Sequence, residues 1–527
     1  MTVLLHGSGD LPDGGWERWV EVRASKSVRL DETLRLDGTE RALESAFAET
    51  QPQWWALAAQ LAVEPSARLC HAATAGGNVS DLGAMLAWTR LVAAWAETAP
   101  TILCICDDPW LFRHLRGIPG VRAGKAPPLW RSEIRLTMRG WLSRMAVAGR
   151  MVRASLACRG QTHSVSHGDP AILVYGHPAS RTDGFDAYFG ALSTYRCDIK
   201  RILHVDCPPS RAQELGVGLH GWGSPWAALT LAFRRWRPRI EGPCAWLIRR
   251  AAALEGATGT PAMIAWQIHC QRRFLKKAHP SVVAWPWENH AWERDFARTC
   301  RQAGVTTLGY QHATIGTLEG NYAAYSLPDD TQALPDTIGC AGSLSMARLA
   351  DWGVPPDRLW LAGAWRFPAP DRVPTWSPDA PVFLVLPALP KVAAQMLDAA
   401  RRAARSGIRF LVREHPMTPV GFVPEPGLER SPGGLYDLDR VKGVVFAAST
   451  VGLEAMLAGL PVVRFLARDE AVNDILPPGL DVSAATADEL PDRIRRIAGP
   501  AVSALDAGSV FAHIDPARWC ERFGGKR

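Results

Sequence analysis

The chain has 527 residues, of which 47% are hydrophobic and 21% are charged. This length and apolar fraction exclude a disordered or fibrous chain and predict two or more domains, each with its own core. The chain carries 22 Trp against 7 Tyr and a formal net charge of +7, which favours an anionic partner: nucleic acid, a membrane surface or a phosphorylated substrate.

Targeting and redox signals are sparse. The N-terminus has no basic segment followed by a long apolar stretch, so we expect no signal peptide. No run of 18 apolar residues predicts a membrane span. The 11 Cys residues form no CxxC pair, which disfavours zinc ribbons and thioredoxin-like sites. We expect reduced, mostly buried thiols in a cytoplasmic protein, and no metal site.

Short apolar runs alternate with helical patterns, which is typical of parallel sheets in an α/β protein. We assign residues 1–94 to an accessory N-terminal region and residues 95–330 to an N-terminal Rossmann-like domain. The predicted strands of this part are Thr101–Cys106, Ala171–Tyr175, Ile202–Val205, Val282–Trp285 and Val305–Tyr310.

A basic helix is predicted over Leu129–Leu156, in a stretch (residues 113–159) with eleven Lys and Arg and one acid. One arc of the helix carries Arg131, Arg135, Arg139, Arg150 and Arg153, and the adjacent arc carries Trp130, Ile134, Met138, Trp141, Met145 and Val152. This pattern is typical of an interfacial helix on anionic lipid. We therefore expect Arg131, Arg135, Arg139 and Trp141 to face a membrane. The alternative is a core helix with a solvated basic face. No nucleic-acid-binding signature is present.

Polar residues follow two of the predicted strands. Glu288 follows the strand Val282–Trp285, and His312 follows Val305–Tyr310. Neighbouring strand ends would place both side chains in one crevice. In its aromatic surroundings Glu288 is expected to carry a raised pKa and act as a general base, with His312 positioning substrate. The alternatives are a helix-start acid stabilised by the helix dipole and a buried structural His.

Residues 336–505 read as a second Rossmann-like domain, with strands at 382–386, 408–412, 444–447 and 461–465. Arg413, His415 and Pro416 follow the second of these strands, where ligands bind in open α/β sheets. Pro416 restricts the backbone of His415, which we expect to donate to a phosphate or a nucleobase carbonyl.

A capped helix follows the strand Val444–Ala447. Ser449 is a natural N-cap, and Thr450 opens a helix whose free N–H groups and dipole form a phosphate site. Glu454, one turn further along, is placed to reach a ribose diol; the alternative is an ordinary capped helix. Residues 506–527 are expected to form a tail, helical around Trp519, that packs back across the domains.

These motifs resemble a known family. The His-Pro turn and the Ser-Thr helix resemble the donor-binding half of GT-B glycosyltransferases, above all those that use CMP-activated ulosonic acids (Kdo, sialic acid) and the CDP-glycerol polymerases. Further segments resemble bacterial surface-carbohydrate biosynthesis proteins. They are Phe185–Leu192, Trp287–Glu293, Gly309–His312, Leu361–Arg366 and Phe511–Trp519.

The resemblance implies a GT-B fold, two Rossmann-like domains facing a central cleft. His415 and Pro416 match the turn near the cytidine phosphate, Ser449 and Thr450 the phosphate-binding helix start, and Glu454 its ribose contact. Glu288 stands where a catalytic carboxylate would be placed, and Arg413 replaces a Lys often seen in the family. Asn289, Gln311 and Arg366 are expected in the acceptor site or behind it.

The predicted function is a metal-independent, nucleotide-sugar-dependent glycosyltransferase of surface polysaccharide (O-antigen or capsule) biosynthesis. It would transfer an ulosonic acid from a CMP-sugar to a lipid-linked or polysaccharide acceptor, without a cofactor. We expect it at the inner face of the cytoplasmic membrane, with no nucleic-acid partner. The alternatives are a CDP-glycerol-type transferase, a UDP-sugar 2-epimerase, and a non-catalytic sugar-nucleotide-binding component of a polysaccharide assembly complex.

Overall fold

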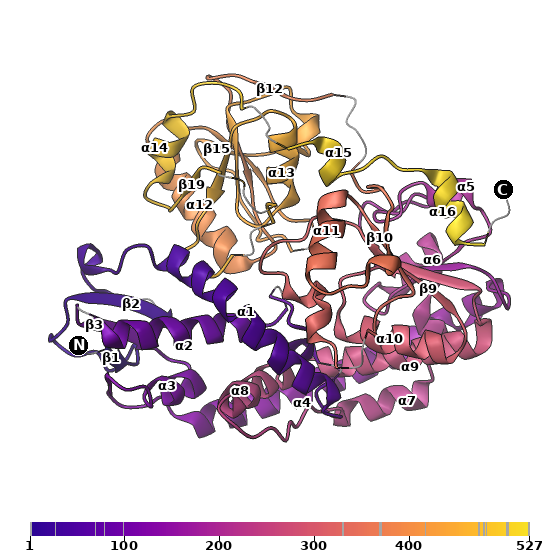
Figure 1. Ribbon diagram of the computed structural model, residues 1–527, viewed down its shortest axis with the longest axis horizontal. Helices are drawn as coiled ribbons and strands as arrows, with labels where there is room; N and C mark the ends of the chain where they lie inside the picture. Colours follow the sequence, from indigo (N-terminus) through magenta and orange to yellow (C-terminus); the bar gives the residue numbers. More distant parts are fainter. Residues whose placement is uncertain are drawn as a thin grey trace.

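The computed structural model describes residues 3–524 apart from 27, 69, 78, 99, 329–330, 368–371, 417, 473–474, 478–479, 481 and 502–504. In this part of the chain, three larger sheets and a two-stranded one are formed, and all their strand pairs are parallel. Helices surround the sheets (Figure 1). The fold is therefore α/β, with the two predicted Rossmann-like domains and an additional parallel sheet.

The additional sheet gathers the N-terminal part of the chain. Its order is β2-β3-β1-β4, with bounds Val3–His6 (β1), Arg18–Arg23 (β2), Ile102–Cys106 (β3) and Val121–Ala123 (β4). Its core includes side chains of α1 (Thr39–Val63), α2 (Leu82–Glu97) and α3 (Pro109–Leu115). The predicted boundary at residues 94–95 is wrong, because the fully buried strand β3 pairs with both β1 and β2.

The second sheet has seven strands in the order β11-β10-β9-β8-β5-β6-β7. Their bounds are Ala171–Val174 (β5), Lys200–Leu203 (β6), Val217–Gly218 (β7), Val282–Pro286 (β8), Thr306–Gln311 (β9), Thr337–Cys340 (β10) and Leu359–Leu361 (β11). The predicted boundary between residues 330 and 336 is also wrong. β10 and β11 pair onto β9, so the second domain continues past residue 360.

Eight helices accompany this part of the described chain. They are α4 (Leu129–Cys158), α5 (Leu192–Tyr195), α6 (Pro209–Leu215), α7 (Pro225–Leu229), α8 (Ala245–Gly256), α9 (Thr260–Ala278), α10 (Ala291–Gln302) and α11 (Ser343–Asp351). The predicted basic helix is confirmed as α4. No described helix combines the length and apolar character needed to cross a bilayer.

The third sheet has the order β15-β14-β13-β17-β18-β19. Its strands are β13 (Val382–Val385), β14 (Phe410–Arg413), β15 (Leu428–Arg430), β17 (Gly443–Phe446), β18 (Val462–Phe465) and β19 (Ala484–Ala485); β12 (Thr375–Trp376) pairs with β16 (Arg440–Val441). The helices are α12 (Pro390–Arg405), α13 (Thr450–Leu457) and α14 (Leu490–Arg495). After β13 the chain continues to β14 and β15 on one side of the sheet, and after β17 it continues to β18 and β19 on the other side. A topological switch point therefore lies between β13 and β17.

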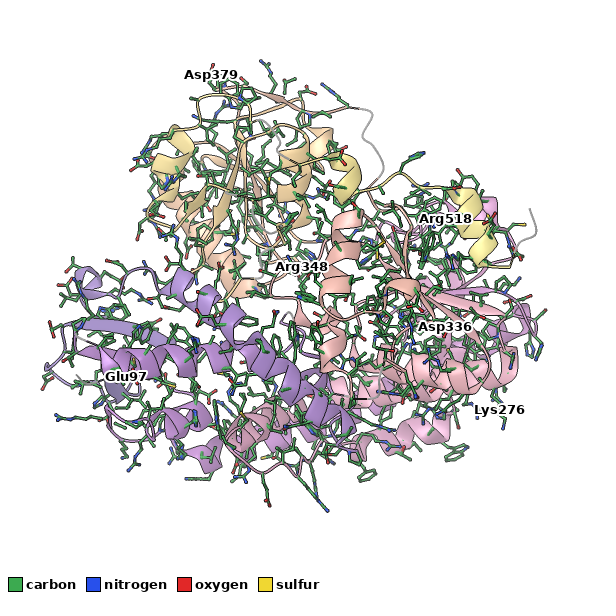
Figure 2. All side chains as sticks on the ribbon, viewed as in Figure 1. Glu97, Lys276, Asp336, Arg348, Asp379 and Arg518 are labelled. Carbon is green, nitrogen blue, oxygen red and sulfur yellow. The ribbon has the colours of Figure 1, made fainter. Side chains whose placement is uncertain are left out.

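The tail returns to the second domain, as predicted. It forms α15 (Ala507–Val510) and α16 (Pro516–Arg522). Trp519 is fully buried, and its Nε1 donates to the Ala362 carbonyl oxygen at 2.8 Å. Its ring packs edge-on against Tyr310 and Phe189. Figure 2 shows Arg518 on this returning helix, on the opposite side of the view from Glu97 at the end of α2.

Candidate functional site

Polar side chains gather where strands of the second sheet end. Glu288 follows β8 and His312 follows β9, the neighbouring strand. The carboxyl ends of parallel strands meet at one edge of the sheet. The structure brings the two side chains together as predicted, with Glu288 Oε1 3.9 Å from His312 Nε2.

Glu288 is held by a histidine that the sequence analysis did not single out. Its Oε2 lies 2.8 Å from His290 Nε2. Burial would raise the pKa of Glu288, but the hydrogen bond and charge of His290, together with His312 and Arg366, lower it to about 2. The expectation of a raised pKa is therefore wrong. Its carboxylate, 37% exposed, is ionised at neutral pH.

A residue from the N-terminal part of the chain, which carries the additional sheet, also lies beside this pair. The ring of His71 stacks on His290, with centroids 6.3 Å apart. Burial lowers the pKa of His71 to about 4, so its ring is neutral at pH 7. The pKa of His290 is instead raised, because the hydrogen bond and charge of Glu288 outweigh its burial. The result is an ion pair of Glu288 and His290 closed on one side by a neutral ring.

His312 is buried and neutral. Burial, with the charge of Arg366, lowers its pKa to about 3. Its ring stacks on Tyr188, with centroids 4.9 Å apart. Its Nδ1 has no hydrogen-bond partner among the described residues. The ring is therefore fixed in place and carries no positive charge at neutral pH.

Asn289 and Gln311 belong to the framework of the site. Both are fully buried. Asn289 adopts φ +56° and donates from Nδ2 to the Asn321 carbonyl oxygen at 2.7 Å, while Gln311 donates to the Ala313 carbonyl oxygen. Glu293 accepts from Trp285 Nε1 at 2.9 Å and from the backbone N–H of Glu288 at 3.0 Å. These contacts shape the segment that carries Glu288.

The C-terminal domain presents a second group of residues. Arg413 ends β14, and His415 and Pro416 follow it. Thr418 Oγ1 lies 3.1 Å from His415 Nδ1. Burial lowers the pKa of His415, and the charges of Arg366 and Arg413 lower it further.

Ser449 caps α13, as predicted. It follows β17, and its side chain accepts from the Val451 backbone N–H at 3.4 Å. Thr450 is the first residue of the helix. Burial raises the pKa of Glu454, one turn later, to about 7, although Arg413 and Arg366 act to lower it. The free N–H groups of this helix start stand at the switch point of the sheet.

Arg366 connects the two groups. It follows β11, and its guanidinium carbon lies 5.8 Å from the centroid of the Tyr188 ring. It forms no hydrogen bond or ion pair with any residue that the structure describes. Its charge lowers the pKa values of Glu288 and His312 in the second domain and of His415 and Glu454 in the third. One exposed cation therefore acts on both domains.

His177 also lies near residues of both groups. It lies after β5, and its ring packs edge-on against Tyr188. Burial lowers its pKa to about 4, and the charges of Arg366 and His415 lower it further. No motif of the sequence singles out His177, so its place in the site was not predicted.

Two further predictions concern metals and the basic helix. In the described ranges, no three His, Cys, Asp or Glu side chains are grouped as a metal ion would require. Arg131, Arg135, Arg139 and Trp141 are all exposed on α4.

No family model and no curated protein sequence matches the chain. Similar solved structures include the lipopolysaccharide outer core galactosyltransferase WaaB in its apo form, with 12% identity, a TM-score of 0.32, and coverage of 67% of this chain and 94% of that one. Another is MnaA of S. aureus with UDP, at 10% identity, a TM-score of 0.37, and coverage of 65% and 94%.

A third is the UDP-GlcNAc 2-epimerase of Neisseria meningitidis bound to UDP-GlcNAc, at 11% identity, a TM-score of 0.30, and coverage of 56% and 82%. Similarities of this strength carry no argument about what the chain does. The fold class rests on the chain's own parallel sheets, which form the two Rossmann-like domains that a GT-B fold requires.

Proposed function

We propose that the protein is a glycosyltransferase that transfers a sugar from a nucleotide donor. The observation that carries this proposal is the position of Arg366. Its charge acts on an ionised carboxylate, Glu288, in one domain and on the His415 and Glu454 group in the other. A phosphate bound near Arg366 would lie between Glu288, which is suited to an acceptor hydroxyl, and the residues His415 and Glu454, which are suited to a nucleotide.

The nucleotide is assigned to the C-terminal domain. The start of α13 supplies free N–H groups and the positive end of a helix dipole. His415, Arg413 and Arg366 add donors and charge, and Glu454 supplies a carboxylate for the ribose hydroxyls. These groups neutralise a leaving phosphate, and for that reason we propose that transfer needs no metal ion.

Glu288 is proposed as the group that accepts the acceptor's proton. A new bond forms between the acceptor oxygen and the anomeric carbon, the bond from that carbon to phosphate oxygen breaks, and the hydroxyl proton passes to Glu288. A carboxylate with a pKa near 2 is a weak base. A bound donor phosphate offsets the charge of Arg366, which raises the pKa of Glu288, so the base is strengthened once the donor is in place.

The substrates are proposed from the resemblance of the motifs. The donor is a CMP-activated ulosonic acid, Kdo or a nonulosonic acid, and the acceptor is a lipid-linked glycan or a polysaccharide of the bacterial surface. The place of action is the cytoplasmic side of the membrane. A CDP-glycerol-type transferase differs only in the group that the cytidine nucleotide carries.

A nucleotide-sugar screen tests the donor, with thermal unfolding as the readout. CMP-sugars are expected to raise the unfolding temperature more than UDP-sugars do. Isothermal titration with CMP then tests the site: His415→Ala is expected to weaken binding about tenfold, whereas the exposed His513→Ala leaves it unchanged. An unchanged affinity in His415→Ala would contradict the assignment of the nucleotide site.

A transfer assay separates the alternatives. Glu288→Gln is expected to keep donor binding and to lose transfer by a factor of 100 or more. Turnover of a UDP-sugar without any acceptor would favour a 2-epimerase. Donor binding with no transfer or hydrolysis in the wild-type protein would favour a non-catalytic binding component.

A further inference from the structure

Helix α4 turns an apolar face outward. Its exposed large apolar side chains are 46% to 62% accessible and comprise Trp130, Ile134, Met138, Trp141, Leu142, Met145 and Leu156. Their spacing of three and four residues places them along one side of the helix. The buried side is a different one and includes Leu136, Arg144, Val147 and Met151. This apolar arc is therefore not the side of α4 that packs in the core, although α4 also has a buried side.

A second segment with exposed apolar side chains packs against α4. Trp226 and Leu229 of α7 are 80% and 53% exposed, and Phe233, in the 3₁₀ turn Thr230–Phe233, is 82% exposed. Arg144 Nε on α4 donates to the Ala232 carbonyl oxygen at 3.1 Å, which places Phe233 beside α4. Figure 1 shows α4 and α7 on the side of the molecule away from the third sheet. Exposed aromatic rings thus lie on two neighbouring elements that are far apart in sequence.

Positive charge borders the apolar residues. The exposed arginines of α4 are Arg131, Arg135, Arg139, Arg150 and Arg153, and those that follow Phe233 are Arg234, Arg235, Arg237 and Arg239. None of them forms an ion pair with an acidic side chain in the described part of the chain. Arg131 lies over the Trp130 ring, 5.2 Å from its centroid. Glu133 is the one acidic residue of α4.

We propose that α4 and the segment Trp226–Phe233 form a membrane-docking surface for an anionic lipid bilayer. The apolar side chains would enter the boundary between headgroups and acyl chains, and the arginines would contact lipid phosphates. A second copy of the chain fits poorly, because two such faces would bring their arginines together. The proposal rests on the membrane location in the proposed function. To that location it adds the residues of α4 that contact the bilayer, the segment Trp226–Phe233 and the negative charge of the lipid.

Vesicle flotation of the full chain tests the docking surface. We expect the wild-type protein to float with vesicles of phosphatidylcholine and phosphatidylglycerol, and to bind vesicles of phosphatidylcholine alone at least tenfold more weakly. Trp226→Ser with Phe233→Ser is expected to weaken binding at least tenfold, and so is Arg135→Glu with Arg139→Glu. Matched controls on other exposed positions are Val63→Ser with Val423→Ser, and Arg68→Glu with Arg405→Glu, which leave binding unchanged.

Two outcomes would overturn the proposal. One is the absence of binding to the anionic vesicles by a folded wild-type protein. The other is a dimer in sedimentation equilibrium that Trp226→Ser with Phe233→Ser dissociates, which would assign the surface to a second copy. Flotation needs no nucleotide sugar, so it fails or succeeds independently of transferase activity. Donor titration of the same variants reports whether the site is intact.

Discussion

At the scale of single residues, chemistry depends on partners that are distant in sequence. Glu288 and His312 were predicted from strand ends, and the structure places them together. The protonation of Glu288 was predicted wrongly, because the sequence suggested an aromatic pocket and did not reveal the neighbouring cations. His290 is two residues away in sequence, but Arg366 arrives from another element.

The Glu288–His290 pair predicts a pH-dependent stability. The lowered pKa of Glu288 stabilises the fold above the unfolded pKa near 4.5, and this stability is lost as the pH falls toward 2. The raised pKa of His290 stabilises it below 6.5, and this is lost as the pH rises through the folded value. His290→Gln should therefore reduce the free energy of unfolding by about 1 kcal/mol at pH 5.5, after screening of the partly exposed carboxylate, and by less at pH 9.

Urea unfolding at the two pH values measures this difference. His513→Gln, at an exposed position, serves as the control and should change neither value. Equal losses at pH 5.5 and pH 9 in His290→Gln would show that the pair contributes no charge interaction.

The buried Glu454 carboxylate is expected to lower the stability of the fold while it contributes to nucleotide binding. Burial raises its pKa to about 7, so ionising it in the folded state costs stability as the pH rises from 4.5 through 7. Glu454→Gln should raise the free energy of unfolding by about 1–3 kcal/mol at pH 8.5, by less at pH 5, and should weaken nucleotide binding. The exposed Glu429→Gln in the same domain is the control. A loss of stability at pH 8.5 would contradict this account.

At the scale of elements, local pattern was informative. The strands β13, β14, β17 and β18 and the helix α4 were predicted within two residues of their ends, and the start of α13 was predicted at Thr450. The strands are marked by apolar runs, and α13 is marked by its cap, Ser449. The sequence pattern alone did not decide whether the apolar arc of α4 faces the core or the solvent. The structure decides it, because the residues that pack against the core lie on a different side of the helix.

The docked tail predicts a measurable contribution to stability. Trp519 is fully buried against Tyr310 and Phe189 and donates to Ala362. Trp519→Ala should lower the free energy of unfolding by about 3–5 kcal/mol. The neighbouring Arg518→Ala should cost much less, because its side chain is exposed. Urea unfolding compares the two variants; similar small losses in both would show that the tail docks weakly.

At the scale of the whole molecule, the sequence predicted the fold class but not the partition of the chain. Two boundaries were wrong because parallel sheets join strands that are far apart in sequence. β1 pairs with β3 across about a hundred residues, and β10 and β11 complete a sheet that the apolar pattern had ended at β9. Non-local pairing leaves no trace in the periodicity of a single strand. The same limit applies to the site, whose residues come from separate domains.

We propose that Arg366 is shared by the two halves of one nucleotide-sugar site. Isothermal titration of the protein with a CMP-sugar tests it most directly, with Arg366→Ala compared with Arg518→Ala. Both arginines lie over an aromatic ring, Tyr188 for Arg366 and Trp360 for Arg518. We expect Arg366→Ala to weaken donor binding at least tenfold and Arg518→Ala to leave it unchanged. Equal donor affinity in wild-type protein and Arg366→Ala would contradict it.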